Sequence, residues 1–112
     1  MSDEVMGLAN KLKADFPGSV TGIEEFRDDV TVTVERNDIV KVCEYCRDSE
    51  GFEFNLLSDL CGIDYLGSTP RFGVSYVMYS LSCNHTLRLK VFVPEEDPVL
   101  PTVTGVWPGS NW

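Results

Sequence analysis

Residues 52–65, FEFNLLSDLCGIDY, hold the side chains of this sequence that are best suited to chemistry. Asp59 and Asp64 are five positions apart and could act as a pair of acids, and Cys61 between them could be a nucleophile or a metal ligand. The alternative is a local role, because aspartates in irregular segments often accept hydrogen bonds from the backbone of their own turn. For the two aspartates we favour the local role.

Four cysteines, Cys43, Cys46, Cys61 and Cys83, raise the question of a metal or redox site. Cys43 and Cys46 have the Cys-x-x-Cys spacing, but they fall inside a helical pattern and share one face with Ile39. A zinc or iron–sulfur site normally uses a turn whose amides face the sulfurs, and the remaining spacings match no such motif. The pair also does not open a helix after a strand, as a thioredoxin-like pair does. We predict that both are buried structural residues. A small cysteine-based metal or redox protein is the alternative.

His85 is the only histidine, and it falls beside Asn84 in a predicted hairpin turn. A Cys-His-Asp catalytic set would have to be built around the tip of this loop, so we do not expect one. The glycines of the C-terminal half form no G-x-G-x-x-G or G-x-x-x-x-G-K phosphate loop. Residue chemistry alone therefore favours a binding or assembly role, such as an acidic protein-interaction module, over catalysis.

Composition sets wider limits on function. The chain has 112 residues, 43% of them hydrophobic and 24% charged, which predicts one soluble globular domain. Its net charge of −9 would repel nucleic acid and anionic lipid surfaces. The acidic N-terminus MSDEVMG predicts no secretory signal, and no apolar run reaches the ~18 residues of a membrane span. We expect a cytoplasmic protein with reduced cysteines.

Hydrophobic spacing predicts two helices. The first covers residues 3–15 and is amphipathic. The second covers about residues 38–49, with Cys43 and Cys46 on its apolar side, and we expect Gly51 to end it.

Alternating apolar residues predict five strands. The runs are residues 20–26, 30–35, a segment from Phe52 onward, 71–82 and 87–93. The first two should form a hairpin, and the third should contain a bulge or irregular turn near residues 58–62, where Leu57 breaks the alternation. Apolar residues on both faces of 71–82 indicate a central strand covered on both sides. The order α-β-β-α-β-β-β predicts an α+β domain over residues 1–97, with two helices on a mainly antiparallel sheet.

Residues 98–112 form a C-terminal tail whose composition differs from that of the domain. The tail is rich in proline and holds both tryptophans of the chain. Its apolar set consists of Val103, Val106, Trp107 and Trp112. These residues could pack back onto the sheet or anchor a partner, and we take them as the candidate subunit interface. We expect the tail to be the least well anchored segment of the isolated chain.

Three blocks of the sequence resemble the 30 kDa subunit of respiratory complex I, the C subunit of the proton-pumping NADH:quinone oxidoreductase. The first is FNLLSDLCGIDYLG, with a Leu-x-Asp core and a following Asp-Tyr. The second is RFGVSYVMYSL, and the third begins at LRLKVFVPEEDP. In the third block residues 101–107 and 110–112 are similar to the family's Pro-Ser-Val-Thr-x-x-Trp and Ala-x-Trp, with Thr102 in place of Ser and Ser110 in place of Ala. The family's Glu-Arg-Glu signature would begin after Trp112, so we expect a truncated or naturally short member.

This resemblance implies a function without chemistry of its own. The family's subunit holds no flavin, iron–sulfur cluster, quinone or metal, so no cofactor-binding or catalytic residue is expected in this chain. It is implied to be a structural subunit of the peripheral arm, on the cytoplasmic face of the inner membrane, packed against the quinone-site subunit and iron–sulfur subunits. Asp59, Cys61 and Asp64 would then be structural. Related subunits also occur in membrane-bound hydrogenases and in dehydrogenases with other donors, which leaves the electron donor open.

Overall fold

The computed structural model describes residues 2–26, 29–49, 51–64 and 72–93. Its elements are α1 (Ser2–Asp15), β1 (Val20–Phe26), β2 (Asp29–Val34), the short 3-10 helix η1 (Arg36–Asp38), α2 (Ile39–Asp48), β3 (Leu56–Asp64), β4 (Phe72–Ser80) and β5 (His85–Val93). The predicted α+β class and the order α-β-β-α-β-β-β are confirmed. Neither helix in this part of the chain is long and apolar enough to span a membrane.

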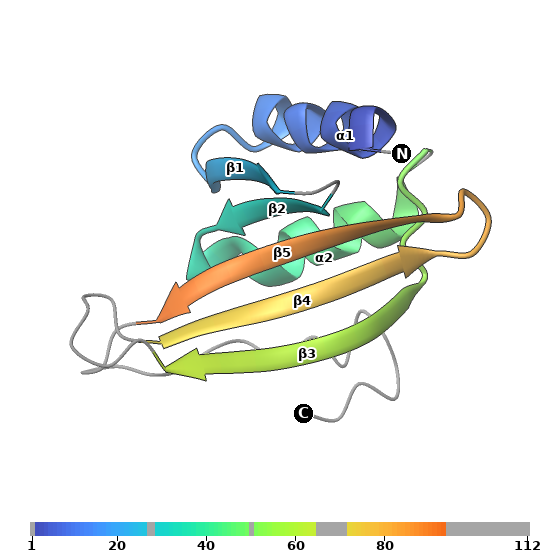
Figure 1. Ribbon diagram of the computed structural model, residues 1–112. Helices are drawn as coiled ribbons and strands as arrows, with labels where there is room; N and C mark the ends of the chain where they lie inside the picture. Colours follow the sequence, from blue (N-terminus) through green and yellow to red (C-terminus); the bar gives the residue numbers. More distant parts are fainter. Residues whose placement is uncertain (1, 27–28, 50, 65–71, 94–112) are drawn as a thin grey trace.

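The five strands form one sheet in the order β1-β2-β5-β4-β3 (Figure 1). Neighbouring strands are antiparallel except for β2 and β5, which run parallel. The last strand of the described residues, β5, therefore lies at the centre of the sheet, between the hairpin β1-β2 and the pair β3-β4. The predicted central strand, β4, is an inner strand paired with β5 on one side and β3 on the other, although β5 holds the middle position of the sheet.

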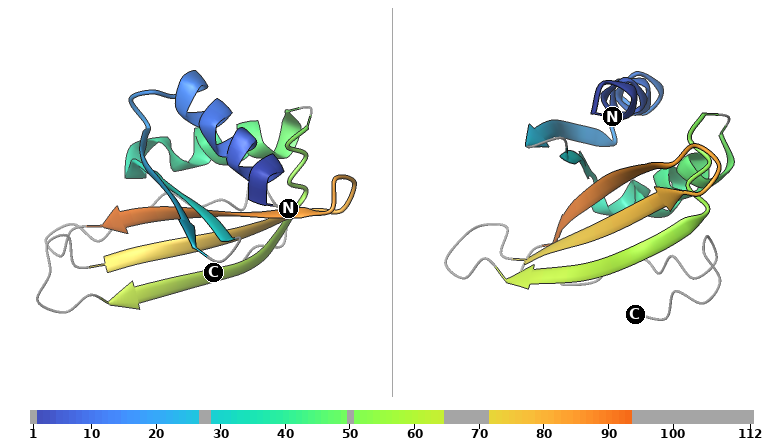
Figure 2. Two further views of the ribbon diagram at one scale, coloured as in Figure 1. Left: turned by 45° about the horizontal axis from the view of Figure 1, so that its top comes forward. Right: turned by 45° about the vertical axis from the view of Figure 1, so that its right-hand side comes forward.

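Both helices lie on one face of the sheet (Figure 2). Because apolar residues recur at helical spacing in α1 and α2 and at every second position in β2 and β5, one side of each element enters a common core. The helices contribute Val5, Ala9, Leu12, Ile39, Val42, Cys43 and Cys46. The strands contribute Val30, Val32, Val34, Tyr76, Met78, Leu87, Leu89, Val91 and Val93. Helices α1 and α2 cover this face of β4. Cover on its other face would have to come from residues outside the described part of the chain, so that half of the expectation stays a prediction.

The third strand begins at Leu56 and not at Phe52, which corrects the sequence prediction. Phe52 and Phe54 are fully buried in the segment between α2 and β3. Glu53 between them has a φ of 48°, a left-handed conformation outside the region of regular strands. The alternation of this segment thus comes from a turn that sends two aromatic rings into the core. The predicted irregularity further along is confirmed, since the register of β3 against β4 shifts between Leu57 and Asp59.

Gly51 lies in the turn after α2, and its φ of 86° is also left-handed. A Cβ added there would meet no atom within 4 Å, so the cost of a side chain would come from the backbone alone. We expect Gly51→Ala to lower the free energy of unfolding by about 1–2 kcal/mol.

Gly7 offers a control of opposite sign for this substitution. It lies on the exposed side of α1, where an added Cβ also has open space. Gly7→Ala should raise stability by about 1 kcal/mol, because alanine is the better helix former. Urea unfolding of both variants measures the two changes, and a neutral Gly51→Ala would contradict the left-handed turn.

Candidate functional site

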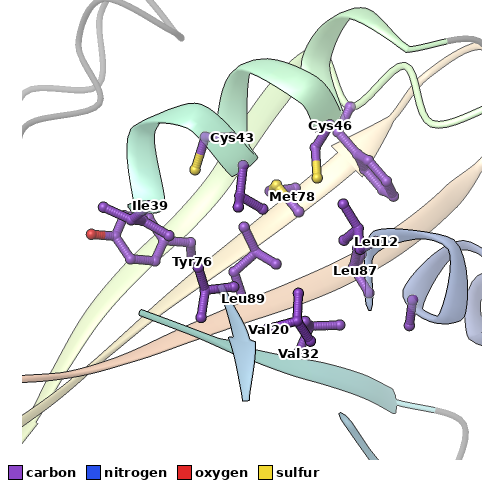
Figure 3. Packing of buried hydrophobic residues seen from close by; sticks show 14 of the residues in the cluster. Leu12, Val20, Val32, Ile39, Cys43, Cys46, Tyr76, Met78, Leu87 and Leu89 are labelled. Carbon is purple, nitrogen blue, oxygen red and sulfur yellow. The ribbon is translucent and has the colours of Figure 1, made fainter. Parts of the chain in front are cut away.

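Cys43 and Cys46 lie on the buried side of α2 and point toward the sheet (Figure 3). Burial, with a smaller contribution from Glu44, raises the pKa of the Cys43 thiol to about 12. Burial also raises the pKa of Cys46 well above its ordinary value, with Cys43 as the second cause. Both thiols are therefore protonated near neutral pH, whereas a nucleophile or metal ligand must be a thiolate. The predicted burial of Cys43 and Cys46 is confirmed.

Thiol labelling should separate the cysteines by their burial. We expect Cys61, which is exposed, to react rapidly in the native protein, and Cys43 and Cys46 to react only when the fold opens. Replacing either buried cysteine by Ala should lower stability by about 1 kcal/mol, the scale of a small buried group. Mass spectrometry after timed labelling measures the rates. Rapid native labelling of Cys43 or Cys46 would contradict their placement.

Asp59 and Cys61 of the 52–65 segment have only local contacts in the described part of the structure. The Asp59 side chain is exposed, and its Oδ1 accepts a hydrogen bond of 2.9 Å from the backbone N–H of Leu60. This is the local role that the sequence predicted. Cys61 is also exposed, with its Sγ 3.7 Å from the carbonyl oxygen of Gly62. The Asp64 side chain lies outside the described part of the structure, so its predicted role stays a prediction.

Cys83 belongs to a polar junction between the segment before β3 and the hairpin turn before β5. The Glu53 carboxylate lies 3.6 Å from the Cys83 Sγ and accepts a hydrogen bond of 3.3 Å from the Ser82 hydroxyl. The Leu81 N–H donates to Asn55 Oδ1 over 3.3 Å. These contacts fix the turn that carries Phe52 and Phe54, which gives Glu53 a bracing role that its sequence pattern did not indicate.

The sequence analysis placed His85 in the hairpin turn, which was wrong. His85 is the first residue of β5. Its ring is buried, 4.9 Å between centroids from Phe54, and its Nε2 lies 3.2 Å from the carbonyl oxygen of Phe52. Since a carbonyl can only accept, Nε2 is the protonated nitrogen there. His85 therefore supports the same junction from the core side.

The described residues hold no group of three or more histidine, cysteine, aspartate or glutamate side chains that could bind a metal ion. Val103, Val106, Trp107 and Trp112 lie outside these residues, so the predicted subunit interface is untested. The remaining surface with a distinct character is the sheet face turned away from α1 and α2, here called the open face.

Strand register identifies the open face, because paired residues of adjacent strands project to the same side. It carries an apolar set from three strands, namely Leu56, Val77, Tyr79 and Phe92. Arg88 and Lys90 of β5 lie on the same side. Leu56 and Phe92 are 45% and 37% exposed, and Val77 and Tyr79 are half-buried. The sequence analysis missed this surface. The alternation of buried and more exposed residues along β5 could have indicated it.

Comparisons with known proteins agree on one family. Residues 32–112 match the family described as "Respiratory-chain NADH dehydrogenase, 30 Kd subunit". The C subunit of the NADH-quinone oxidoreductase of Roseiflexus sp. (strain RS-1) is 43% identical over 105 residues, covering 94% of this chain and 60% of that protein. The same subunit of Geobacter metallireducens is 44% identical over 103 residues, covering 91% of this chain and 62% of that protein. The chain thus spans about 60% of the length of these curated relatives.

A solved structure has the same fold. A chain in the structure of the membrane-bound sulfane sulfur reductase, an archaeal respiratory membrane complex, superposes with a TM-score of 0.75 over 94% of this chain and 60% of that chain. The sequence identity is 14%, so this likeness concerns the fold alone.

Proposed function

Because the chain belongs to the family of the 30 Kd subunit of the respiratory-chain NADH dehydrogenase, we propose that it is an assembly subunit of a proton-translocating NADH:quinone oxidoreductase or a related membrane-bound complex. It contributes protein contacts to the peripheral arm, while partner subunits carry the flavin, the iron–sulfur clusters and the quinone. The observation that carries this proposal is the family match over residues 32–112.

The side-chain environments support a role without chemistry. Cys43 and Cys46 are protonated members of the core, and Asp59 is used by its own backbone. Cys83 and His85 brace the junction at the ends of β4 and β5. Each of these residues in the described part of the chain thus has a structural task.

The proposed partners are the quinone-site subunit and the iron–sulfur subunits of the peripheral arm. Such a subunit would sit on the cytoplasmic face of the membrane through its partners. The proposed contact is formed by the segment that carries Val103, Val106, Trp107 and Trp112, with at least Val106 and Trp112 touching the partner, because aromatic and aliphatic side chains gathered on one segment are typical of an interface.

Co-purification tests the assignment. The tagged chain, expressed in its own host, should be recovered from solubilised membranes together with iron–sulfur and quinone-site subunits. Trp112→Ser should reduce this recovery, while Leu81→Ser, at a 66% exposed position in the hairpin turn, should not. Recovery of the chain only as a free monomer would overturn the assembly role. Stoichiometric zinc or iron on the anaerobically purified chain would favour the metal or redox alternative.

A further inference from the structure

The open face offers an apolar path that crosses the sheet. Register places Phe92 near the end of β5 and Val77 in the next strand, followed by Tyr79 and then Leu56 at the start of β3. These four side chains lie along a diagonal of the part of the face formed by β3, β4 and β5, with Ser75 between Phe92 and Val77. The opposite face is filled by α1 and α2, as both views in Figure 2 show. Because exposed apolar surface on one side of a sheet is costly in water, a segment that covers this path would gain stability.

The chain itself supplies a segment of matching chemistry directly after β5. Strand β5 ends at Val93, one residue after Phe92, and the sequence continues through Pro94 and the acidic run of residues 95–97 into the apolar residues 98–112. Pro94 cannot donate to a sheet ladder, so the strand cannot simply continue. The ten residues from Val93 to Val103 can span up to ~35 Å. A nine-residue strand such as β4 is only ~30 Å long, so the segment can reach any point of the face.

Charge favours the same side of the sheet. The acidic run of residues 95–97 carries three negative charges. Arg88 and Lys90 project from the open face, and the Lys90 Nζ lies 5.2 Å from the centroid of the Phe92 ring, close to the end of β5. The exposed Asp59 of β3 lies on the same face, opposite Val77, so the attraction is local to β5. An acidic segment that leaves β5 is attracted to Arg88 and Lys90 there.

We propose that residues 98–112 dock on the open face, with Val103 and Trp107 packed along the path of Phe92, Val77, Tyr79 and Leu56. The prolines at 101 and 108 and the β-branched residues between them favour an extended backbone, in which positions 103 and 107 project to the same side. Val106 has the other parity and faces outward, where a partner protein has access to it. Trp112 follows the turn dipeptide Pro108-Gly109 and in this proposal leaves the extended run for the same outward side. The docking is a property of this chain and does not depend on the proposed assembly role.

Tryptophan fluorescence tests this docking directly, because Trp107 and Trp112 are the only tryptophans. In Trp112→Phe the remaining Trp107 should emit at short wavelength and be several-fold less quenched by acrylamide than a free tryptophan peptide. In Trp107→Phe the remaining Trp112 should be quenched more readily than Trp107 is. Trp107 that is quenched as readily as the peptide would overturn the proposal.

Substitutions on the face identify where Trp107 packs. In the Trp112→Phe background, Val77→Glu should shift the Trp107 emission to longer wavelength and raise its quenching several-fold. Phe92→Ser, at a more exposed position of the same path, should also shift the Trp107 emission to longer wavelength and raise its quenching. It replaces Val77→Glu in the test if circular dichroism shows that Val77→Glu does not fold. Leu81→Ser is the matched control off the face and should leave both readouts unchanged. If Trp107 stays protected from acrylamide in both folded variants, the docking is overturned. It is also overturned if the protection disappears on dilution, because Trp107 would then be covered by a second copy of the chain.

Discussion

Replacing Phe54 by Ala is expected to lower the free energy of unfolding by about 3–5 kcal/mol, the range for large-to-small changes in a packed core. Phe54 is fully buried, and its ring lies 6.4 Å from that of Phe52 and 4.9 Å from that of His85 between centroids. Its neighbours Phe52 and His85 are held by the tight turn at Glu53 and by the start of β5. They can therefore move little into the cavity that alanine would leave. Since small domains are stable by only about 5–15 kcal/mol, this change would remove a large part of the total.

Urea unfolding followed by circular dichroism measures the effect. Leu81→Ala is the matched control, because Leu81 is a large apolar residue close to the same junction but mostly exposed. It should change stability by less than about 0.5 kcal/mol. If Phe54→Ala costs as little as this control, the 52–55 segment is not part of the cooperative core.

Stability is expected to fall steeply as the pH rises above 9. The folded pKa of Cys43 is raised from its ordinary 9.0 to about 12, and that of Cys46 is raised as well. Between these values the unfolded chain releases the thiol protons and the folded chain retains them. The unfolded state therefore binds fewer protons, and each buried thiol removes about 1.4 kcal/mol of unfolding free energy per pH unit. Burial raises the pKa of the Tyr76 phenol too, which adds to the loss at the alkaline end of this window.

The double variant Cys43→Ala, Cys46→Ala isolates the contribution of the thiols. It should be less stable than the parent at pH 7, because small buried groups are lost, but its stability should decline less with pH. The difference between the two proteins should shrink from about pH 8 to about pH 10.5 in urea titrations run at each pH. Parallel stability curves across this range would show that the two thiols ionise equally in the folded and unfolded states.

Much of the fold could be predicted because its helices and strands follow simple periods. The bounds of α1 and β1 and the burial of Cys43 and Cys46 came from spacing alone. The strand order could not, since no local pattern says that β5 inserts between β2 and β4. The start of β3 was predicted wrongly because Phe52 and Phe54 alternate like strand residues. Only the backbone of Glu53, which is left-handed, separates the two interpretations.

The candidate site was predictable where it depended on local backbone and was missed where it depended on long-range packing. The hydrogen bond from the Leu60 N–H to Asp59 joins neighbours, so the local sequence could indicate it. His85 was placed in a turn because the preceding Cys83 and Asn84 are typical of one. Its contact with Phe52 bridges segments that only the folded chain brings together. The open face is also a product of register, because its residues come from three strands.

The central position of β5 has a consequence for the order of folding during synthesis. Residues 31–33 of β2 pair with residues 88–90 of β5, so the two halves of the sheet stay separate until β5 has been made. Closing so long a loop is an entropic barrier that local contacts cannot offset, and such topologies fold slowly. Until residue 93 has left the ribosome, the hairpin β1-β2 and the pair β3-β4 expose the apolar sides that they later share. A nascent chain of this protein should therefore depend on chaperones until β5 emerges.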